Sequence, residues 1–448
     1  MHEERSAFAR GPRERPLRVV IDRETAIKDE ALQLLLELAG REHVELFSTS
    51  PDDEKALRIE IDPIDRSEDM APVRIHRAES FSHRAVIFAH QYEEMARASA
   101  AAGETSEEDA LRALLLAAAA YDLGADALVT GSPVLLSGEH GEFIARSNPL
   151  PSTVAAALAG LFLRLRADFA YVSVQGLNEA VSPWLFYWIV TRDLLPAGWR
   201  WLSGCSDQTR NEIAMADLAG SALERFSRAL RARDHLHEQV RLSATNETND
   251  VAVFYFDVVL LMLTAAFDIA AHVAHLVYEL PPKTYRSATW RRQWWRDDLR
   301  VAANPLAALM DKEQPARDAL ELAAILRNKI HGEALRAVTF KRGGRPAETM
   351  IELPSPVVDD LRVAASRLGG EADWGFRASG PRTYIEPDQY VEALLPAVAS
   401  GLNDLMAATE VERLGAPKVV RSAGAPDEWP WDEDTRLRLR LLAGVAST

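Results

Sequence analysis

Residues 17–22 have the sequence LRVVID, a short apolar run that ends in an aspartate. Such a run is typical of a strand buried within a parallel sheet. A stretch with helical spacing follows at 29–40, and a second strand-like run follows at 43–49. Because open parallel sheets form their sites at the carboxyl ends of the strands, Asp22 is the first candidate functional residue.

The alternation of strand and helix patterns continues as far as residue 166. The expected elements are a strand at 56–62, helices at 85–101 and 106–124, a strand at 125–130 and a closing helix at 151–166. Strands separated by helices indicate an α/β domain with a mainly parallel sheet. We therefore expect such a domain over 17–166, after a flexible N-terminus at 1–16.

The rest of the chain has mainly helical patterns. We expect a tryptophan-rich helical connector at 167–235, a mostly α-helical domain at 236–412 and a mobile or docking tail at 413–448. The helical domain is expected to contain helices at about 250–279, 314–335, 355–369 and 386–409. A β-hairpin is expected near 337–353, because Gly343-Gly344 supplies the backbone angles that a tight turn requires.

Composition limits the classes of function. The 448 residues are 48% hydrophobic and 26% charged, which is ordinary for a soluble globular protein. A formal net charge of −16 argues against a general polyanion binder, so nucleic-acid contact would require a local basic patch. The single cysteine, Cys205, excludes an intrachain disulfide and fits a reducing, cytoplasmic location.

The most apolar stretch, 251–280, is expected to be a core helix and not a membrane span. Asp257 and Asp268 interrupt it, and a span needs roughly 20 mostly apolar residues. Residues 1–16 are charged and lack the apolar segment of a signal peptide. We therefore expect no membrane partner.

The sharpest short motif is LRNKIHG at 326–332. On a helix its Arg327 and His331 share one face. A histidine can exchange a proton near neutral pH, and an arginine can stabilise charge that develops on a phosphate. The pair therefore suits RNA cleavage, although arginine and histidine also commonly decorate exposed helix faces.

A long apolar helix followed by an Arg-Asn…His helix resembles the HEPN superfamily of helical domains, over about 236–412. Ribonuclease members carry an Arg-x(4–6)-His motif, whereas only three residues separate Arg327 from His331 here. The resemblance implies metal-independent RNA cleavage in which His331 acts as base or acid, Arg327 stabilises the transition state and Asn328 holds the local geometry. It also implies a homodimer, because these enzymes usually build their active site where two such domains meet.

The same resemblance implies an acidic or polar residue from the preceding long helix beside the motif. Asp257 and Asp268 are the candidates. A carboxylate there could orient the histidine or the arginine during catalysis, or it could only neutralise Arg327.

The N-terminal part, about 17–166, resembles PIN-like nuclease domains. These begin with a strand that ends in Asp, as Asp22 does, and Asp109 matches a second metal-binding carboxylate, with Asp126 as an extra candidate. Ser132 stands where active members have Asp. The resemblance therefore implies Mg²⁺ or Mn²⁺ as a cofactor only if this incomplete site is active, and we expect metal binding to be weak or absent. Asp109 could equally be a helix N-terminal carboxylate.

The only concentrated basic segment is 285–300. Arginines neutralise phosphates while aromatic rings stack on bases. The candidate nucleic-acid contacts are Arg286, Trp290, Arg291, Arg292 and Arg296. The alternative is an amphipathic helix with inward tryptophans and solvated arginines.

No phosphate-binding glycine loop and no zinc motif is present, so nucleotide cofactors and zinc are not expected. The leading hypothesis is an RNA-binding endoribonuclease (a hydrolase) of the toxin–antitoxin or antiphage-defence type, with a possible antitoxin or other protein partner. The alternative is a catalytically inactive PIN/HEPN-like scaffold that binds RNA, a nucleotide or a protein.

Overall fold

The computed structural model describes Phe8 and residues 15–61, 73–77, 80–84, 89–103, 105–137, 147–174, 177–242, 244–330, 334–340, 347–415 and 432–445. The chain forms two compact units. The N-terminal unit comprises 1–182, 341–347 and 434–448, and the helical unit comprises 183–340 and 348–433.

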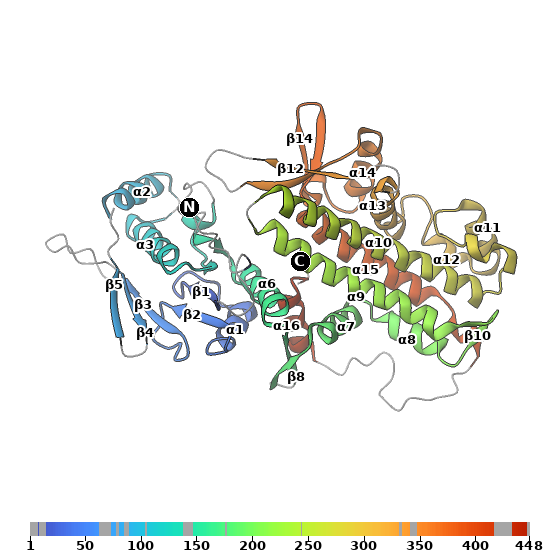
Figure 1. The fold of residues 1–448 in the computed structure, drawn as a ribbon, viewed down its shortest axis with the longest axis horizontal. Coiled ribbons are helices and arrows are strands. Elements are labelled where there is room, and N and C mark those ends of the chain that lie inside the picture. The colour runs from blue at the N-terminus through green and yellow to red at the C-terminus, as the bar shows by residue number, and fades with distance from the viewer. Residues whose placement is uncertain are drawn as a thin grey trace. The chain divides into compact units, whose positions relative to one another are not determined.

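The N-terminal unit is built on a seven-stranded sheet of order β5-β4-β3-β2-β1-β6-β7 (Figure 1). The strands are β1 (Leu17–Ile21), β2 (Val44–Ser48), β3 (Leu57–Ile61), β4 (Val73–Arg77), β5 (Ser80–Arg84), β6 (Ala127–Val129) and β7 (Pro149–Leu150). Strands β3, β2, β1, β6 and β7 are parallel to one another. Strands β4 and β5 add an antiparallel pair at the β3 edge of the sheet. The expected α/β domain with a mainly parallel sheet is confirmed, and the antiparallel edge was not expected.

Helices lie on both faces of this sheet (Figure 1). They are α1 (Glu30–Glu37), α2 (Ala89–Ala101), α3 (Glu107–Leu123), the short α4 (Pro133–Leu136) and α6 (Ser152–Phe162). The alanine and leucine side chains of α3 are buried against Val20, Phe47 and Leu128 of the sheet. Ser106 caps the start of α3, which fixes where this apolar run enters the core.

The expected closing helix at 151–166 forms as α6 and continues without a break into a π-helical turn that ends at Ala167. One π-helical turn (Leu163–Ala167) follows α6, and a hairpin of β8 (Ala170–Val174) and β9 (Leu177–Val181) completes this part of the unit. The proposed connector 167–235 is therefore divided, because the unit boundary falls after residue 182.

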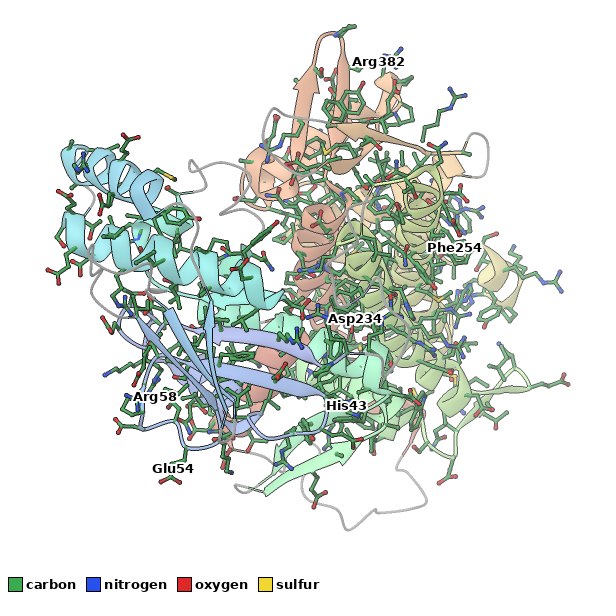
Figure 2. All side chains as sticks on the ribbon, turned by 60° about the vertical axis from the view of Figure 1, so that its left-hand side comes forward. His43, Glu54, Arg58, Asp234, Phe254 and Arg382 are labelled. Carbon is green, nitrogen blue, oxygen red and sulfur yellow. The ribbon has the colours of Figure 1, made fainter. Side chains whose placement is uncertain are left out.

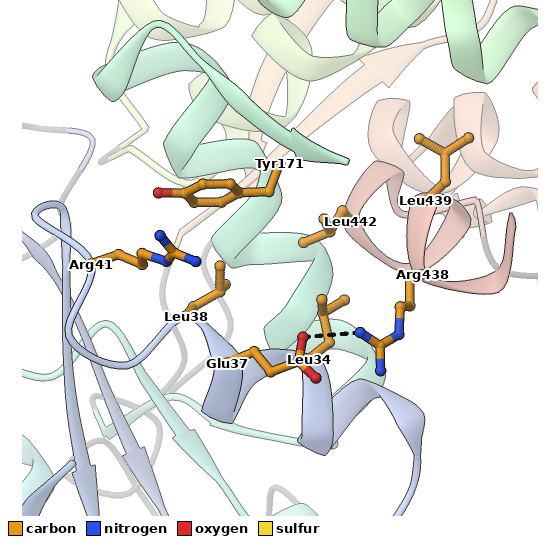
Figure 3. Close-up of a pocket in the computed structure, with 8 residues that line it drawn as sticks. All are labelled: Leu34, Glu37, Leu38, Arg41, Tyr171, Arg438, Leu439 and Leu442. Carbon is orange, nitrogen blue, oxygen red and sulfur yellow. Dashed lines mark hydrogen bonds and ion pairs between the residues drawn. The ribbon is translucent and has the colours of Figure 1, made fainter. Parts of the chain in front are cut away.

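The tail expected to be mobile or docking contains a packed helix, α16 (Glu433–Ala443). Arg438 pairs with Glu30 and Glu37 of α1, and Arg164 donates to the carbonyl oxygen of Leu442 at 2.6 Å. Figure 3 shows the cavity between α1, β8 and α16; at about 10 Å³ it has room for about one water molecule. Residues 434–445 thus form part of the N-terminal unit.

The helical unit contains the long helices expected from the sequence. Its α-helices are α7 (Pro183–Leu194), α8 (Ala197–Cys205), α9 (Met215–Val240), α10 (Asn246–Val277), α11 (Gln293–Ala302), α12 (Asn304–Ala308), α13 (Pro315–Ile330), α14 (Ser355–Arg367) and α15 (Pro387–Ala408). Short elements are strands β10 (Thr209–Arg210) and β11 (Ile213–Ala214) and 3-10 turns at Pro282–Ser287, Glu371–Trp374 and Val411–Leu414.

Helix α10 is the centre of this unit. Thr245 and Thr248 form a reciprocal capping box at its start. The helix is long and apolar enough to cross a membrane by length and composition alone. It packs against α9, α13 and α15, and 56% of its most apolar 18-residue stretch is buried within the protein. This burial supports the expectation of a core helix.

A buried polar network joins α9 to its neighbours. Tyr187 of α7 donates to Asp234 of α9 at 2.7 Å, and Arg233 donates to the other carboxylate oxygen of Asp234 at 2.8 Å. His237 lies 2.7 Å from Glu392 of α15. Figure 2 labels Asp234 on α9. Since buried charges need paired partners, the network specifies how α7, α9 and α15 pack.

The predicted hairpin is confirmed and belongs to a larger sheet of order β12-β13-β15-β14. Its strands are β12 (Arg336–Phe340), β13 (Glu348–Glu352), β14 (Phe376–Ser379) and β15 (Arg382–Ile385), paired antiparallel. The β14–β15 hairpin was not predicted. It turns at Gly380, whose φ of 58° lies in the left-handed region that glycine tolerates.

Candidate functional site

Asp22 lies at the carboxyl end of β1, as the sequence predicted, and its side chain is fully buried. Thr25 donates to Oδ2 of Asp22 at 2.5 Å, and the guanidinium of Arg112 on α3 pairs with Oδ1. Thr130, at the end of the adjacent strand β6, lies 3.3 Å from Oδ2. Both carboxylate oxygens are therefore engaged by hydrogen-bond donors within the protein.

The loop after β6 closes over this carboxylate. The backbone N–H of Gly131 donates to Oγ1 of Thr25 at 3.1 Å. A Cβ at Gly131 would lie 2.1 Å from the carbonyl oxygen of Thr25, so only glycine allows this approach. Ser132 follows and is buried at the start of α4. The loop thus brings a hydroxyl side chain, Ser132, to the position where the resemblance calls for a carboxylate.

Asp109 and Asp126 do not join Asp22 in a carboxylate cluster. Asp109 is exposed in the first turn of α3 and accepts from the hydroxyl of its cap, Ser106, at 2.7 Å. Asp126 accepts from the backbone N–H of Arg18 at 2.9 Å, at the opposite end of β1 and about 13 Å from Asp22. The assignment of Asp126 to a metal site is therefore corrected. Among the described residues, no group of three or more His, Cys, Asp or Glu side chains could hold a metal ion.

The second candidate site is at the C-terminal end of α13. Arg327 is half-buried, and its Nη1 donates to Oδ1 of the exposed Asn328 at 3.2 Å. Within the described part of the chain, Nε of Arg327 is buried and has no hydrogen-bond partner. His331 lies outside the described residues, so the Arg327–His331 spacing stays a prediction.

Helix α13 runs antiparallel to α10. A Cβ on Gly401 would contact both Ala316, near the start of α13, and the ring of Phe267 in the second half of α10. Asn249, near the start of α10, donates to Thr339 at 2.8 Å, and Thr339 lies in the strand that follows α13. The end of α13 that carries Arg327 therefore lies beside the first half of α10.

Asp257 lies in this first half of α10. Its Oδ1 is buried without a hydrogen-bond partner among the described residues, and burial raises the pKa of its carboxyl group to about 6. Asp257 and Asp268 are three helical turns apart on the same flank, and Asp268 accepts from Thr289 at 2.9 Å. Arg317 of α13 donates to the neighbouring carbonyl of Trp290 at 2.8 Å, so the start of α13 lies near the Asp268 end of this flank.

Of the two acidic candidates on α10, only Asp257 is at the level of the motif. Asp268 is about 16 Å further along α10 and is held by Thr289, beside the start of α13. The assignment of Asp268 to the Arg327 site is therefore corrected, and Asp257 remains.

Some candidate nucleic-acid contacts in the basic segment 285–300 are buried and others are exposed. Trp290 is fully buried and donates to the carbonyl of Phe267 at 2.9 Å, while Arg296 is buried and donates to the carbonyl of Trp290. Neither side chain can reach a base or a phosphate, so their assignment to nucleic-acid contact is corrected. Arg286, Arg291 and Arg292 are exposed and remain candidates.

Sequence reasoning missed Arg112, which decides the chemistry at Asp22. The available signal was one arginine inside the apolar run ALRALLLAAAA at 110–120, because a charge there requires a buried partner. Thr25 and Thr130 carried no comparable signal. Comparisons of the chain with protein-family models, with curated proteins and with solved structures found no match.

Proposed function

We propose that this protein targets RNA and that its helical unit is a metal-independent endoribonuclease. The ribose 2′-hydroxyl attacks the adjacent phosphate, Arg327 stabilises the charge that develops there, and His331 exchanges the proton. The observation that supports this best is the end of α13, where the half-buried Arg327 donates to the exposed Asn328 and keeps a buried Nε without a partner among the described residues.

The raised pKa of Asp257 supplies chemistry that the resemblance alone did not specify. A carboxyl group with a pKa of about 6 is partly protonated near neutral pH, so it can hold or deliver a proton. Transesterification benefits from one group that removes a proton and another that returns one. Asp257 provides the second group, or orients the first.

A homodimer through 236–412 is part of the same proposal. The outward face of α10 exposes Phe254 (58%) and Leu261 (40%), one turn on either side of Asp257 (Figure 2 labels Phe254). Exposed apolar side chains of this kind are typical of the centre of a protein interface. A two-fold axis at this face would bring two motifs together.

The alternative function is a scaffold without nuclease activity, and one observation favours it for the N-terminal unit. Arg112 neutralises Asp22 at the place where a PIN-like nuclease would bind its metal ion. That unit would then contribute binding to RNA, a nucleotide or a protein partner.

The test is incubation of the purified protein with mixed RNA, with and without EDTA. We expect cleavage that survives EDTA and is lost in Arg327→Ala and His331→Ala, while Arg228→Ala, a surface arginine paired with Glu224, stays active. Cleavage that EDTA and Asp22→Asn both abolish would instead indicate a metal-dependent site. No cleavage by the unmodified protein would support the scaffold.

A further inference from the structure

A cavity of about 340 Å³ lies at the open end of the β12–β13 hairpin. Its walls come from the start of β12, the end of β13, the start of β15 and the first residues of α14. The volume is at the lower end of the range for small-ligand sites. It therefore has room for one nucleotide-sized group.

The charges around this cavity favour an anion. The strand register places Arg336 directly opposite Glu352, and Arg382 donates to the same Glu352 at 3.1 Å. Glu352 thus pairs with Arg382, and the structure shows no ion pair of Arg336 with any carboxylate of the described residues. In a chain with a net charge of −16, this is the kind of local basic patch that nucleic-acid binding requires.

The start of α14 adds to this preference. Ser355, its first residue, is exposed in the cavity wall, and the first turn of the helix contains no acidic side chain. The positive end of the helix dipole is therefore not neutralised locally. Leu335 and Leu353 are buried beneath the cavity, and Pro354 and Pro356 border it, so an apolar surface lies beside the charged one.

We propose that this cavity binds one nucleotide of single-stranded RNA. Arg336 and Arg382 hold the phosphate with charge-assisted hydrogen bonds, and the ribose and base lie against the prolines. This inference rests on the proposed function and assigns it a substrate-positioning site. Ala334, on the cavity wall, is six residues after Asn328, so the two lie within about 20 Å, a distance that a short single strand can cover.

The test measures fluorescence anisotropy of a labelled ten-nucleotide RNA with 2′-O-methyl riboses, which this chemistry cannot cleave. We expect Arg336→Ala and Arg382→Ala each to weaken binding about tenfold and to reduce the salt slope of log K by about 0.7, the value for one lost phosphate contact on a single strand. Arg336→Lys should restore most of the slope. Arg377→Ala is the matched control, because Arg377 is exposed on β14 and paired with Glu386 outside the cavity.

Adenosine 5′-monophosphate, added as a competitor, distinguishes the source of the phosphate. Displacement of the RNA by millimolar nucleotide supports one shared site, while binding of the nucleotide alone, without RNA binding, would overturn the assignment to RNA. RNA binding that is equal in the protein and both alanine variants would overturn the cavity and leave the proposed cleavage intact. Binding that depends on both arginines, in a protein that cleaves no RNA, would support the cavity and contradict the nuclease.

Discussion

Arg112 on α3 pairs with Asp22 at the end of β1, although 90 residues separate them in the chain. The arginine side chain is 17% exposed and also contacts the surface residue Glu24, whereas Asp22 is fully buried. Since a buried carboxylate needs an opposite charge or hydrogen-bond donors, this pair holds α3 against the carboxyl end of the sheet. The pair also takes a position that a metal ion would need.

Replacing Arg112 by Met should destabilise the N-terminal unit by about 3–5 kcal/mol, because it leaves Asp22 buried beside a neutral side chain. All ten tryptophans lie outside 1–182, so circular dichroism, and not tryptophan fluorescence, should report the loss during urea unfolding. Arg97→Met is the control, since Arg97 forms exposed pairs on α2 and should change stability by less than about 0.5 kcal/mol. Equal effects of the two changes would contradict a stabilising role for the Arg112–Asp22 pair.

Divalent metal should not bind at Asp22. Calorimetric titration with Mn²⁺ is expected to show no tight site, because Arg112, Thr25 and Thr130 engage the oxygens that a metal ion would coordinate. Tight binding that Asp22→Asn abolishes would show that Arg112 moves aside.

The pH dependence of the protein's stability should reveal the titration of the Asp257 carboxyl group. Its pKa is raised from 3.8 to about 6 in the folded protein, so its stabilising contribution is fully present below about pH 4 and is lost as the pH rises through 6. Asp257→Asn should therefore equal the unmodified protein in stability near pH 4 and exceed it by about 1–2 kcal/mol at pH 8, after allowance for partial exposure. Asp250→Asn, exposed on the same helix, should show no such trend. A pH-independent difference for Asp257→Asn would contradict this assignment.

Burial predicts opposite roles for neighbouring residues of the segment 285–300. Trp290→Ala should destabilise the helical unit by about 3–5 kcal/mol, because the indole is fully buried and bonds to α10. A combined Arg286→Ala, Arg291→Ala and Arg292→Ala variant should keep its stability and weaken RNA binding in the anisotropy assay. RNA affinity that this triple variant leaves unchanged would remove the segment from the binding surface.

The apolar face of α10 should control assembly. Phe254→Glu is expected to convert a homodimer to a monomer in light scattering and to reduce RNA cleavage in parallel, because it places a charge in the apolar centre of the interface. Val301→Glu, at a side chain that is 91% exposed on α11, should leave both unchanged. A protein that is monomeric before any substitution would contradict the dimer.

Local pattern was sufficient for most individual elements. The apolar runs at 17–22 and 43–49, the apolar helix near 250–279 and the hairpin near 337–353 all form within a few residues of their predicted bounds. These features depend on periodicity, capping and turn chemistry, which act between residues close in the chain. The β14–β15 hairpin and the two-residue strand β7 were missed because their patterns are too short to stand out.

Contacts between distant residues required the tertiary structure. The sequence placed aspartates at 22, 109 and 126 and basic residues at 286–296, but only the fold determined that Asp126 lies at the far end of the sheet and that Trp290 and Arg296 are buried. The sequence by itself determined an α/β part followed by a helical part, because backbone periodicity is local. The fold decided which charges meet, as Arg112 meets Asp22, because such pairing depends on which helix face and which strand end the packing of the core brings together.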